Sequence, residues 1–102
     1  EAHKYLGIGY MERGRYDLAV GEFLTTLQLN PFAEDGYKDL GISYGKMGKA
    51  DESINALNEA LVANSSDAEV YNYLGVEYLQ KGELKKAEEN FRAAKAAKSA
   101  FP

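Results

Sequence analysis

Apolar residues recur at spacings of three and four along six segments of the chain, and polar residues fill the positions between them. This pattern is typical of amphipathic α-helices, because residues three and four apart share one face of a helix. Glycine at positions 14, 48 and 82 marks a break within each pair of segments, where it can take the left-handed conformation that ends a helix. The pattern predicts first helices over 2–13, 34–47 and 68–81, and second helices over 16–30, 51–63 and 84–98.

Two further signals place helix ends. Pro31 is expected to end the second helix of the first pair, because proline cannot donate a backbone hydrogen bond to a continuing helix. Ser66 and Glu69 have the spacing of a capping box, which predicts the start of the third pair at this point.

The helix pairs repeat with a period of 34 residues. Leucine followed by glycine occurs at Leu6-Gly7, Leu40-Gly41 and Leu74-Gly75. Other positions match at the same offset, and they are Tyr10, Tyr44 and Tyr78, then Ala19, Ser53 and Ala87, then Phe23, Leu57 and Phe91, then Thr26, Ala60 and Ala94. A period of this length, with a glycine turn between the two helices of each pair, indicates a stacked array of helix pairs. Such an architecture usually presents a binding surface rather than a reaction centre.

The repeated residues predict how each pair packs. Leu-Gly and the following tyrosine share one face of each first helix, and this face is expected to pack on the paired helix. The glycine would let the two backbones approach closely, and the bulky residues at 23, 57 and 91 would fill the space opposite it. We therefore interpret these residues, tyrosines included, as core.

The three units resemble the tetratricopeptide repeat family, whose pattern is an aromatic residue, Leu-Gly, Tyr, Gly at the turn, then Ala, an aromatic residue, Ala and Pro. The departures are mild: His3 replaces the leading aromatic residue, Ser53 and Thr26 replace alanine, and Ser65 and Ser99 stand where proline is usual. The resemblance covers essentially the whole chain. It implies an all-α fold, a right-handed α-solenoid of three helix-turn-helix repeats, forming a single domain over 1–102 with repeats at approximately 1–33, 34–67 and 68–101.

A second stripe on the first helices is not used by this signature. In the resembled family the first helices line a concave groove that binds peptides or helical segments of partner proteins. The resemblance therefore implies a groove with a spine of Ile8, Ile42 and Val76, widened by Tyr5, Met11, Tyr73 and Leu79, and bordered by Lys4, Glu12, Lys38, Lys46 and Asn72. Two other interpretations stay open, in which the spine packs against neighbouring repeats or is covered by a helix of a longer protein.

One ligand class of the family is disfavoured. Members that grip the C-terminal carboxylates of chaperones use Lys and Asn on the first helix, Asn on the third, and Lys and Arg on the fifth. The corresponding residues here are Lys4, Ile8, Asp39, Glu69 and Tyr73, of which only Lys4 agrees. Because Asp39 and Glu69 would repel a terminal carboxylate, we predict no chaperone-tail clamp.

The two ends of the array differ. Contacts between repeats are expected from apolar residues of the second helices, and these are Val20, Leu27 and Leu29, then Ile54, Leu61 and Ala63. Glu88, Lys95 and Ala97 stand at the same places in the third unit, which suits a terminal repeat with a polar outer face, and Phe101-Pro102 suggests one more ordered contact. At the other end, Glu1 lies inside a helix pattern without a visible cap, so we expect further residues upstream.

Charge and composition exclude several classes of function. The net charge is −4, and the middle unit carries seven acidic residues against three basic ones, so a nucleic-acid partner is not expected. The basic residues after position 80 alternate with glutamates, which is typical of a solvated helix face. Since the chain has no apolar run long enough for a membrane span and no signal peptide, we expect no membrane insertion, and a soluble location in the cytoplasm is favoured over the periplasm or the extracellular space.

No residue pattern predicts catalysis. The chain has one histidine, His3, and no cysteine, so neither a zinc site nor a Cys-His nucleophile can be assembled, and His3 is interpreted as a packing residue. The acidic pairs at 34–35 and 51–52 are expected in the first turns of helices, where they favour the helix dipole, and they do not match a calcium loop. We expect no catalytic residue, no metal and no cofactor.

The sequence therefore favours a protein-binding module that acts as an adaptor or scaffold and holds a partner peptide or an amphipathic segment in its groove. The alternative is a structural scaffold that self-associates through the array edges or the groove. A related RNA-reading repeat family is disfavoured by the 34-residue period, the Leu-Gly signature and the acidic middle unit.

Overall fold

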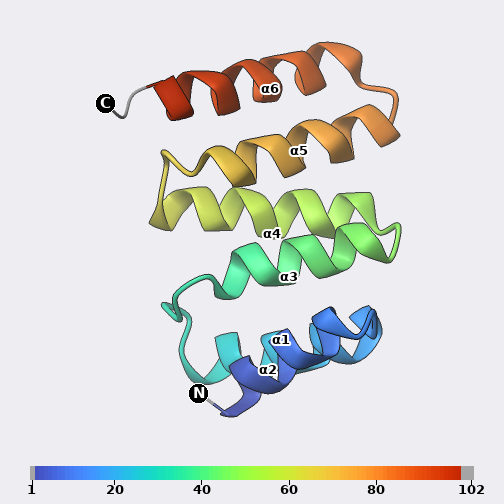
Figure 1. Ribbon diagram of the computed structural model, residues 1–102, viewed down its shortest axis with the longest axis vertical. Helices are drawn as coiled ribbons and strands as arrows, with labels where there is room; N and C mark the ends of the chain where they lie inside the picture. Colours follow the sequence, from blue (N-terminus) through green and yellow to red (C-terminus); the bar gives the residue numbers. More distant parts are fainter. Residues whose placement is uncertain (1, 100–102) are drawn as a thin grey trace.

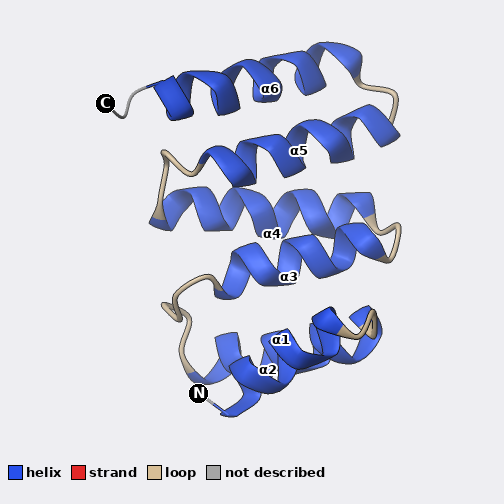
Figure 2. Ribbon diagram, in the orientation of Figure 1, coloured by secondary structure: helices blue, strands red, loops and turns tan. Residues whose placement is uncertain are grey.

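The computed structural model describes residues 2–99, and within this range the chain forms six α-helices and no strand. The helices are α1 (Ala2–Glu12), α2 (Tyr16–Leu29), α3 (Gly36–Lys46), α4 (Ala50–Ala63), α5 (Ala68–Gln80) and α6 (Leu84–Ser99). Consecutive helices pack against one another along the whole array (Figures 1 and 2). The predicted all-α solenoid of three helix pairs is confirmed, and most helix ends lie within one residue of the prediction.

Glycine ends each first helix as predicted. Gly14, Gly48 and Gly82 have φ angles of 74°, 78° and 77°, a left-handed conformation that strains any residue with a Cβ atom. At the first of these turns the amide of Arg15 donates to the carbonyl of Tyr10 at 2.8 Å, and the other two turns repeat this bond. The result is an antiparallel pair with a tight, well-bonded connection.

The predicted close approach within each pair is also confirmed. A Cβ atom placed on Gly7 would lie 2.6 Å from the ring of Phe23, and one on Gly75 would lie 2.6 Å from the ring of Phe91. In the middle pair a Cβ on Gly41 would lie 2.7 Å from Cγ of Leu57 and 3.2 Å from its backbone nitrogen. These distances leave no room for a side chain on the glycine, so the bulky residue of the second helix packs directly on the backbone of the first.

Packing between pairs corrects the assignment of Leu6. Leu40 is 4% exposed in a core cluster with residues of α2, and Leu74 is 1% exposed in a cluster with residues of α4, so this leucine packs on the preceding pair. Leu6 has the same place in α1 but is 50% exposed, because no helix of the described chain precedes it. It was predicted to be core, and that prediction is wrong.

The residues that join the repeats also differ in part from expectation. Val20, Leu27 and Ile54 are buried as predicted, and Leu61 is half-buried against the second core cluster. Leu29 is 73% exposed and Ala63 is exposed, because both lie at the ends of their helices beyond the contact with the next pair. Glu88 and Lys95 are exposed on α6, at the places where the first two units carry apolar residues. The contact expected from Phe101-Pro102 lies outside the described residues.

Helix α3 begins two residues later than predicted. The amide of Phe32 donates to Oδ1 of Asn30 at 3.0 Å, and the amide of Ala33 donates to the carbonyl of Asn30 at 3.1 Å. These turn bonds lead to Asp35, which has a left-handed φ of 60° and cannot continue a right-handed helix. The acidic residues at 34–35 therefore lie in the loop, not in the first helical turn, whereas those at 51–52 do lie in the first turn of α4.

The helices form two unequal layers. Cα atoms of α1 and α3, and of α3 and α5, approach within 8 Å, whereas within residues 2–99 those of α2 and α4, and of α4 and α6, do not. Because the first helices lie closer together than the second helices, the array bends toward the layer of α1, α3 and α5. We call the surface of this layer the inner face, and it carries the stripe predicted to bind a partner.

Candidate functional site

The predicted spine of the inner face is half-buried in every repeat. Ile8, Ile42 and Val76 come from α1, α3 and α5 at equivalent places, 34 residues apart. The other predicted residues divide by exposure: Lys4, Met11, Lys38 and Tyr73 are half-buried, whereas Tyr5, Glu12, Lys46, Asn72 and Leu79 are exposed. Because the stripe is only half-buried and several of its neighbours are exposed, another molecule can contact it from outside the fold.

Part of the stripe also contributes to the core. Ile8 and Met11 pack against the cluster around Phe23, and Tyr73 packs against the cluster around Leu57. The interpretation as packing between repeats therefore applies to these three side chains in part. The most accessible apolar residues of the stripe are Tyr5, 63% exposed, and Leu79, 50% exposed.

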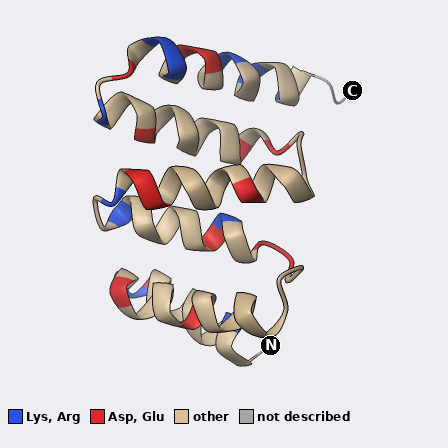
Figure 3. Cartoon of the chain, turned by 180° about the vertical axis from the view of Figure 1, so that it is seen from behind, with Lys and Arg blue, Asp and Glu red and all other residues tan. Residues whose placement is uncertain are grey.

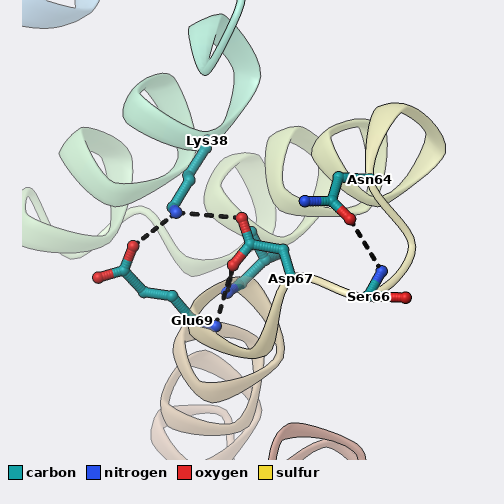
Figure 4. A network of polar contacts seen from close by, with 6 residues as sticks. Lys38, Asn64, Ser66, Asp67 and Glu69 are labelled. Carbon is teal, nitrogen blue, oxygen red and sulfur yellow. Dashed lines mark hydrogen bonds and ion pairs between the residues drawn. The ribbon is translucent and has the colours of Figure 1, made fainter. Parts of the chain in front are cut away.

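Lys38 is held by the start of the next repeat (Figure 4). Its Nζ lies 3.0 Å from Oδ2 of Asp67 and 2.6 Å from Oε1 of Glu69, and its side chain is only 18% exposed. Burial alone would lower the pKa of Lys38, but the hydrogen bonds to Glu69 and Asp67 outweigh it and raise that pKa above its usual value. Lys38 therefore stays charged, and its charge is matched within the fold. Sequence reasoning missed this contact, since it joins residues 29 and 31 positions apart in different repeats.

Asp67 also caps α5, which corrects the predicted capping box. Its Oδ1 accepts hydrogen bonds from the amides of Glu69, at 3.0 Å, and Val70, at 3.3 Å. Ser66 does not cap the helix; its own amide donates to Oδ1 of Asn64 at 3.1 Å (Figure 4). The third unit begins where it was predicted to begin, but one carboxylate both starts α5 and anchors it to α3.

Replacing Asp67 by alanine is expected to destabilise the fold by about 1–2 kcal/mol, because the variant loses the helix cap and leaves Lys38 with one partner fewer. Ser66→Ala is the matched control, and it is expected to change stability by less than about 0.5 kcal/mol, since the bond of Ser66 uses its backbone amide. Urea unfolding followed by circular dichroism measures both. Equal effects of the two substitutions would contradict the assignment of the cap.

The inner face carries one carboxyl group with an altered affinity for protons. Burial raises the pKa of Asp39 to about 6, and the neighbouring charge of Asp35 adds to this shift, while Lys4 and Lys38 oppose it. Asp39 is therefore mostly ionised at pH 7 and loses its charge as the pH falls through about 6. The negative charge beside the stripe is thus weaker in mildly acidic solution.

A second carboxyl group lies between α5 and α3. Glu77 is 4% exposed, and its Oε2 would lie 2.5 Å from a Cβ atom on Gly45, so the absence of a side chain at 45 makes room for it. Burial raises the pKa of Glu77, and Lys46 opposes this shift. Its Oε1 and the hydroxyl of Ser43 make no hydrogen bond within the described chain. Sequence reasoning missed this group, although a glutamate at the place of Gly9 and Ser43 was visible as a departure from the repeat.

The remaining charged residues match a solvated surface. Nδ1 of His3 lies 2.7 Å from Oε1 of Glu22, so this residue joins α1 to α2 through a polar contact. Acidic and basic segments follow one another along α6 (Figure 3), and Arg92 pairs with Glu88 at the predicted i,i+4 spacing. Among residues 2–99 no three His, Asp or Glu side chains form a group that could hold a metal ion. None of the described helices combines the length and the apolar character that a membrane crossing requires.

Comparison with known proteins agrees with the repeat pattern. The tetratricopeptide repeat family matches residues 38–100, more than half of the chain. Among solved structures, MamA of MSR-1 is 25% identical over 98% of this chain with a TM-score of 0.94, and MamA of AMB-1 is 26% identical over 96% with a TM-score of 0.92. This chain spans 57% and 58% of those two proteins, respectively. No match was found among curated proteins.

Proposed function

The chain belongs to the tetratricopeptide repeat family, and on this basis we propose that its inner face binds a peptide or an amphipathic segment of a partner protein. In this role the protein is an adaptor or scaffold rather than an enzyme. The observation that carries the proposal is the half-buried stripe of Ile8, Ile42 and Val76, which runs across three helices in contact.

The character of the stripe favours an apolar ligand. Ile42 lies at its centre, and Tyr5 and Leu79 add accessible apolar surface on the helices to either side of α3. An amphipathic helix or an extended apolar segment could cover this surface and remove it from water, which is the main source of affinity in such complexes. The MamA structures share the fold, and the chain spans little more than half of their length, so the partner has to be sought for this chain itself.

The charges beside the stripe argue against a clamp for terminal carboxylates. Lys38 is already bound by Asp67 and Glu69, and Asp39 adds a further negative charge at neutral pH. A clamp needs cations free to meet the ligand, and like charges at the site would repel it. We therefore infer that chaperone tails ending in carboxylates are not ligands.

Self-assembly is a second candidate function, and one observation favours it. Leu6 is 50% exposed on α1, although the equivalent leucines of α3 and α5 are buried against a preceding helix. A second copy could cover this edge of the array. Light scattering over a range of protein concentrations separates the two functions, since self-assembly raises the mean mass whereas a dedicated partner-binding module stays monomeric.

The inner-face proposal predicts that Ile42→Asp combined with Val76→Asp abolishes partner capture, because two buried charges would face the apolar ligand. Wild type and variant are used to capture proteins from a lysate of the source cells, after circular dichroism has shown that both are folded. Leu24→Asp is the control, since Leu24 is 46% exposed on α2, in the outer layer. We expect the partner to bind the control at least about tenfold more tightly than the inner-face variant. Equal capture by all three proteins would contradict the proposal.

A further inference from the structure

A recess of about 610 Å³ opens at the edge of the array, away from the stripe of the inner face. It lies between the last two turns of α4 on one side and the α2–α3 loop with the first turn of α3 on the other, and the loop projects at this edge in Figure 1. Its lining includes Pro31, Phe32 and Tyr37 on one side and Ala60, Val62 and Ala63 on the other. We call it the edge recess.

The edge recess differs from its counterpart one repeat further on, a recess of about 550 Å³ lined by the start of α5 and by α6. Six residues, 30–35, connect α2 to α3, whereas only four, 64–67, connect α4 to α5. The extra length comes from the late start of α3 after the left-handed Asp35. A non-glycine residue in this conformation is uncommon and is more frequent at functional sites. The longer loop, with its left-handed Asp35, therefore distinguishes the edge recess from this counterpart.

The apolar part of the lining is unusually accessible. Phe32 is 92% exposed and Val62 is 81% exposed, and these are the two highest values among the large apolar residues described. Both side chains border the same recess. Apolar surface of this kind, gathered around a hollow, typically marks a place where another molecule binds.

The polar part of the lining carries uncompensated negative charge. Glu34, Asp35 and Glu59 are exposed and make no ion pair within residues 2–99. The one cation of the described lining is Lys38, and Asp67 and Glu69 already bind it. A ligand that enters the recess therefore meets an apolar wall beside three free carboxylates.

We propose that the edge recess is a second protein-binding site, which takes a segment of a partner with an apolar side chain next to Lys or Arg. The apolar side chain would lie between Phe32 and Val62, and the cation would meet Glu34, Asp35 or Glu59. A symmetric contact between the recesses of two copies is disfavoured, because it would bring the same carboxylates together. Lys38 belongs both to the edge recess and to the predicted border of the inner face, but the apolar spine of the inner face does not line the recess. Each site can therefore be inactivated alone.

A display library of short random peptides, selected on the wild-type protein, tests the proposal. The selected peptides are then measured by fluorescence anisotropy against Phe32→Ser with Val62→Ser, and against Glu34→Lys with Glu59→Lys. All four residues are exposed, so the variants are expected to fold. Leu84→Ser with Glu88→Lys is the matched control, because these residues are also exposed but lie on α6. Ile42→Asp reports separately on the inner face.

We expect peptides rich in Lys or Arg beside Leu, Ile or Phe, which bind at least about tenfold more weakly to either recess variant and equally to the control. Their affinity should fall as the salt concentration rises, since exposed charges are screened. The proposal is overturned if no selected peptide depends on Phe32 and Val62, or if those that do are neutral or acidic. Self-association of the wild type that is lost in Phe32→Ser with Val62→Ser would overturn it as well, by assigning the recess to a second copy. Peptides that respond only to Ile42→Asp would support the inner face and refute the recess.

Discussion

Truncating Leu57 to alanine is expected to lower the free energy of unfolding by about 3–4 kcal/mol. Leu57 is fully buried, and it lies in the middle pair, where it packs on the backbone of α3 and belongs to the core cluster shared with α5. Removing its isobutyl group leaves a cavity that the flanking helices can fill only in part. Because Leu57 packs on α3 and shares a core cluster with residues of α5, its truncation weakens both the middle pair and the junction of that pair with the third.

Urea unfolding followed by circular dichroism measures this loss. Leu29→Ala is the control, since Leu29 is 73% exposed and its truncation is expected to change stability by less than about 0.5 kcal/mol. A loss for Leu57→Ala no larger than that of the control would show that the middle pair is not the core of the array.

The contacts inside each repeat could be predicted because they recur. Glycine opposite a bulky residue appears at the same offset in all three units, and close helix packing is the physical reason for that pairing. The helix turns could be predicted for the same reason, since a left-handed glycine ends each first helix. Packing contacts that recur in every repeat can thus be predicted from a single sequence.

The exceptions depend on position in the array or on single side chains. Leu6 repeats Leu40 and Leu74 in sequence, but its exposure depends on whether a helix precedes it, which periodicity does not encode. The late start of α3 depends on the turn bonds of Asn30 and on the left-handed Asp35. The 34-residue period continues unbroken through this loop and therefore gives no sign of either feature. For the same reason the edge recess could not be predicted.

The candidate binding surface was predictable only in outline. The family resemblance pointed to the stripe, but the contribution of Ile8 and Met11 to the core depends on how far α1 and α2 close on α3. The binding of Lys38 by Asp67 and Glu69 requires the stacking of the repeats to bring the start of α5 beside α3. Lys38 was expected to contact the ligand, but its charge is matched by carboxylates within the fold. The inner face therefore offers less positive charge to a ligand than the sequence suggested.

Gly41→Ala is expected to destabilise the protein by about 2 kcal/mol, even though alanine favours a helix more than glycine does by about 1 kcal/mol. The new Cβ would lie 2.7 and 2.8 Å from two side-chain carbons of Leu57, closer than carbon atoms pack. Gly9→Ala is the matched control, because a Cβ there meets nothing within 4 Å, and it should stabilise the protein by about 0.5–1 kcal/mol through helix propensity alone. If the two variants change stability in opposite directions, the loss for Gly41→Ala comes from packing and not from helix propensity.

The double variant Gly41→Ala with Leu57→Ala tests the contact itself. Truncating Leu57 removes both carbons that obstruct the new Cβ, and the nearest remaining atom is then the backbone nitrogen of residue 57 at 3.2 Å, a contact that a small shift can relieve. The substitution at 41 is therefore expected to change sign, from destabilising in the wild type to neutral or stabilising in the Leu57→Ala background. The coupling should exceed about 1 kcal/mol, as for residues in direct contact. Additive losses in the four urea curves would instead mean that Gly41 is required for its backbone conformation and not for the space it leaves to Leu57.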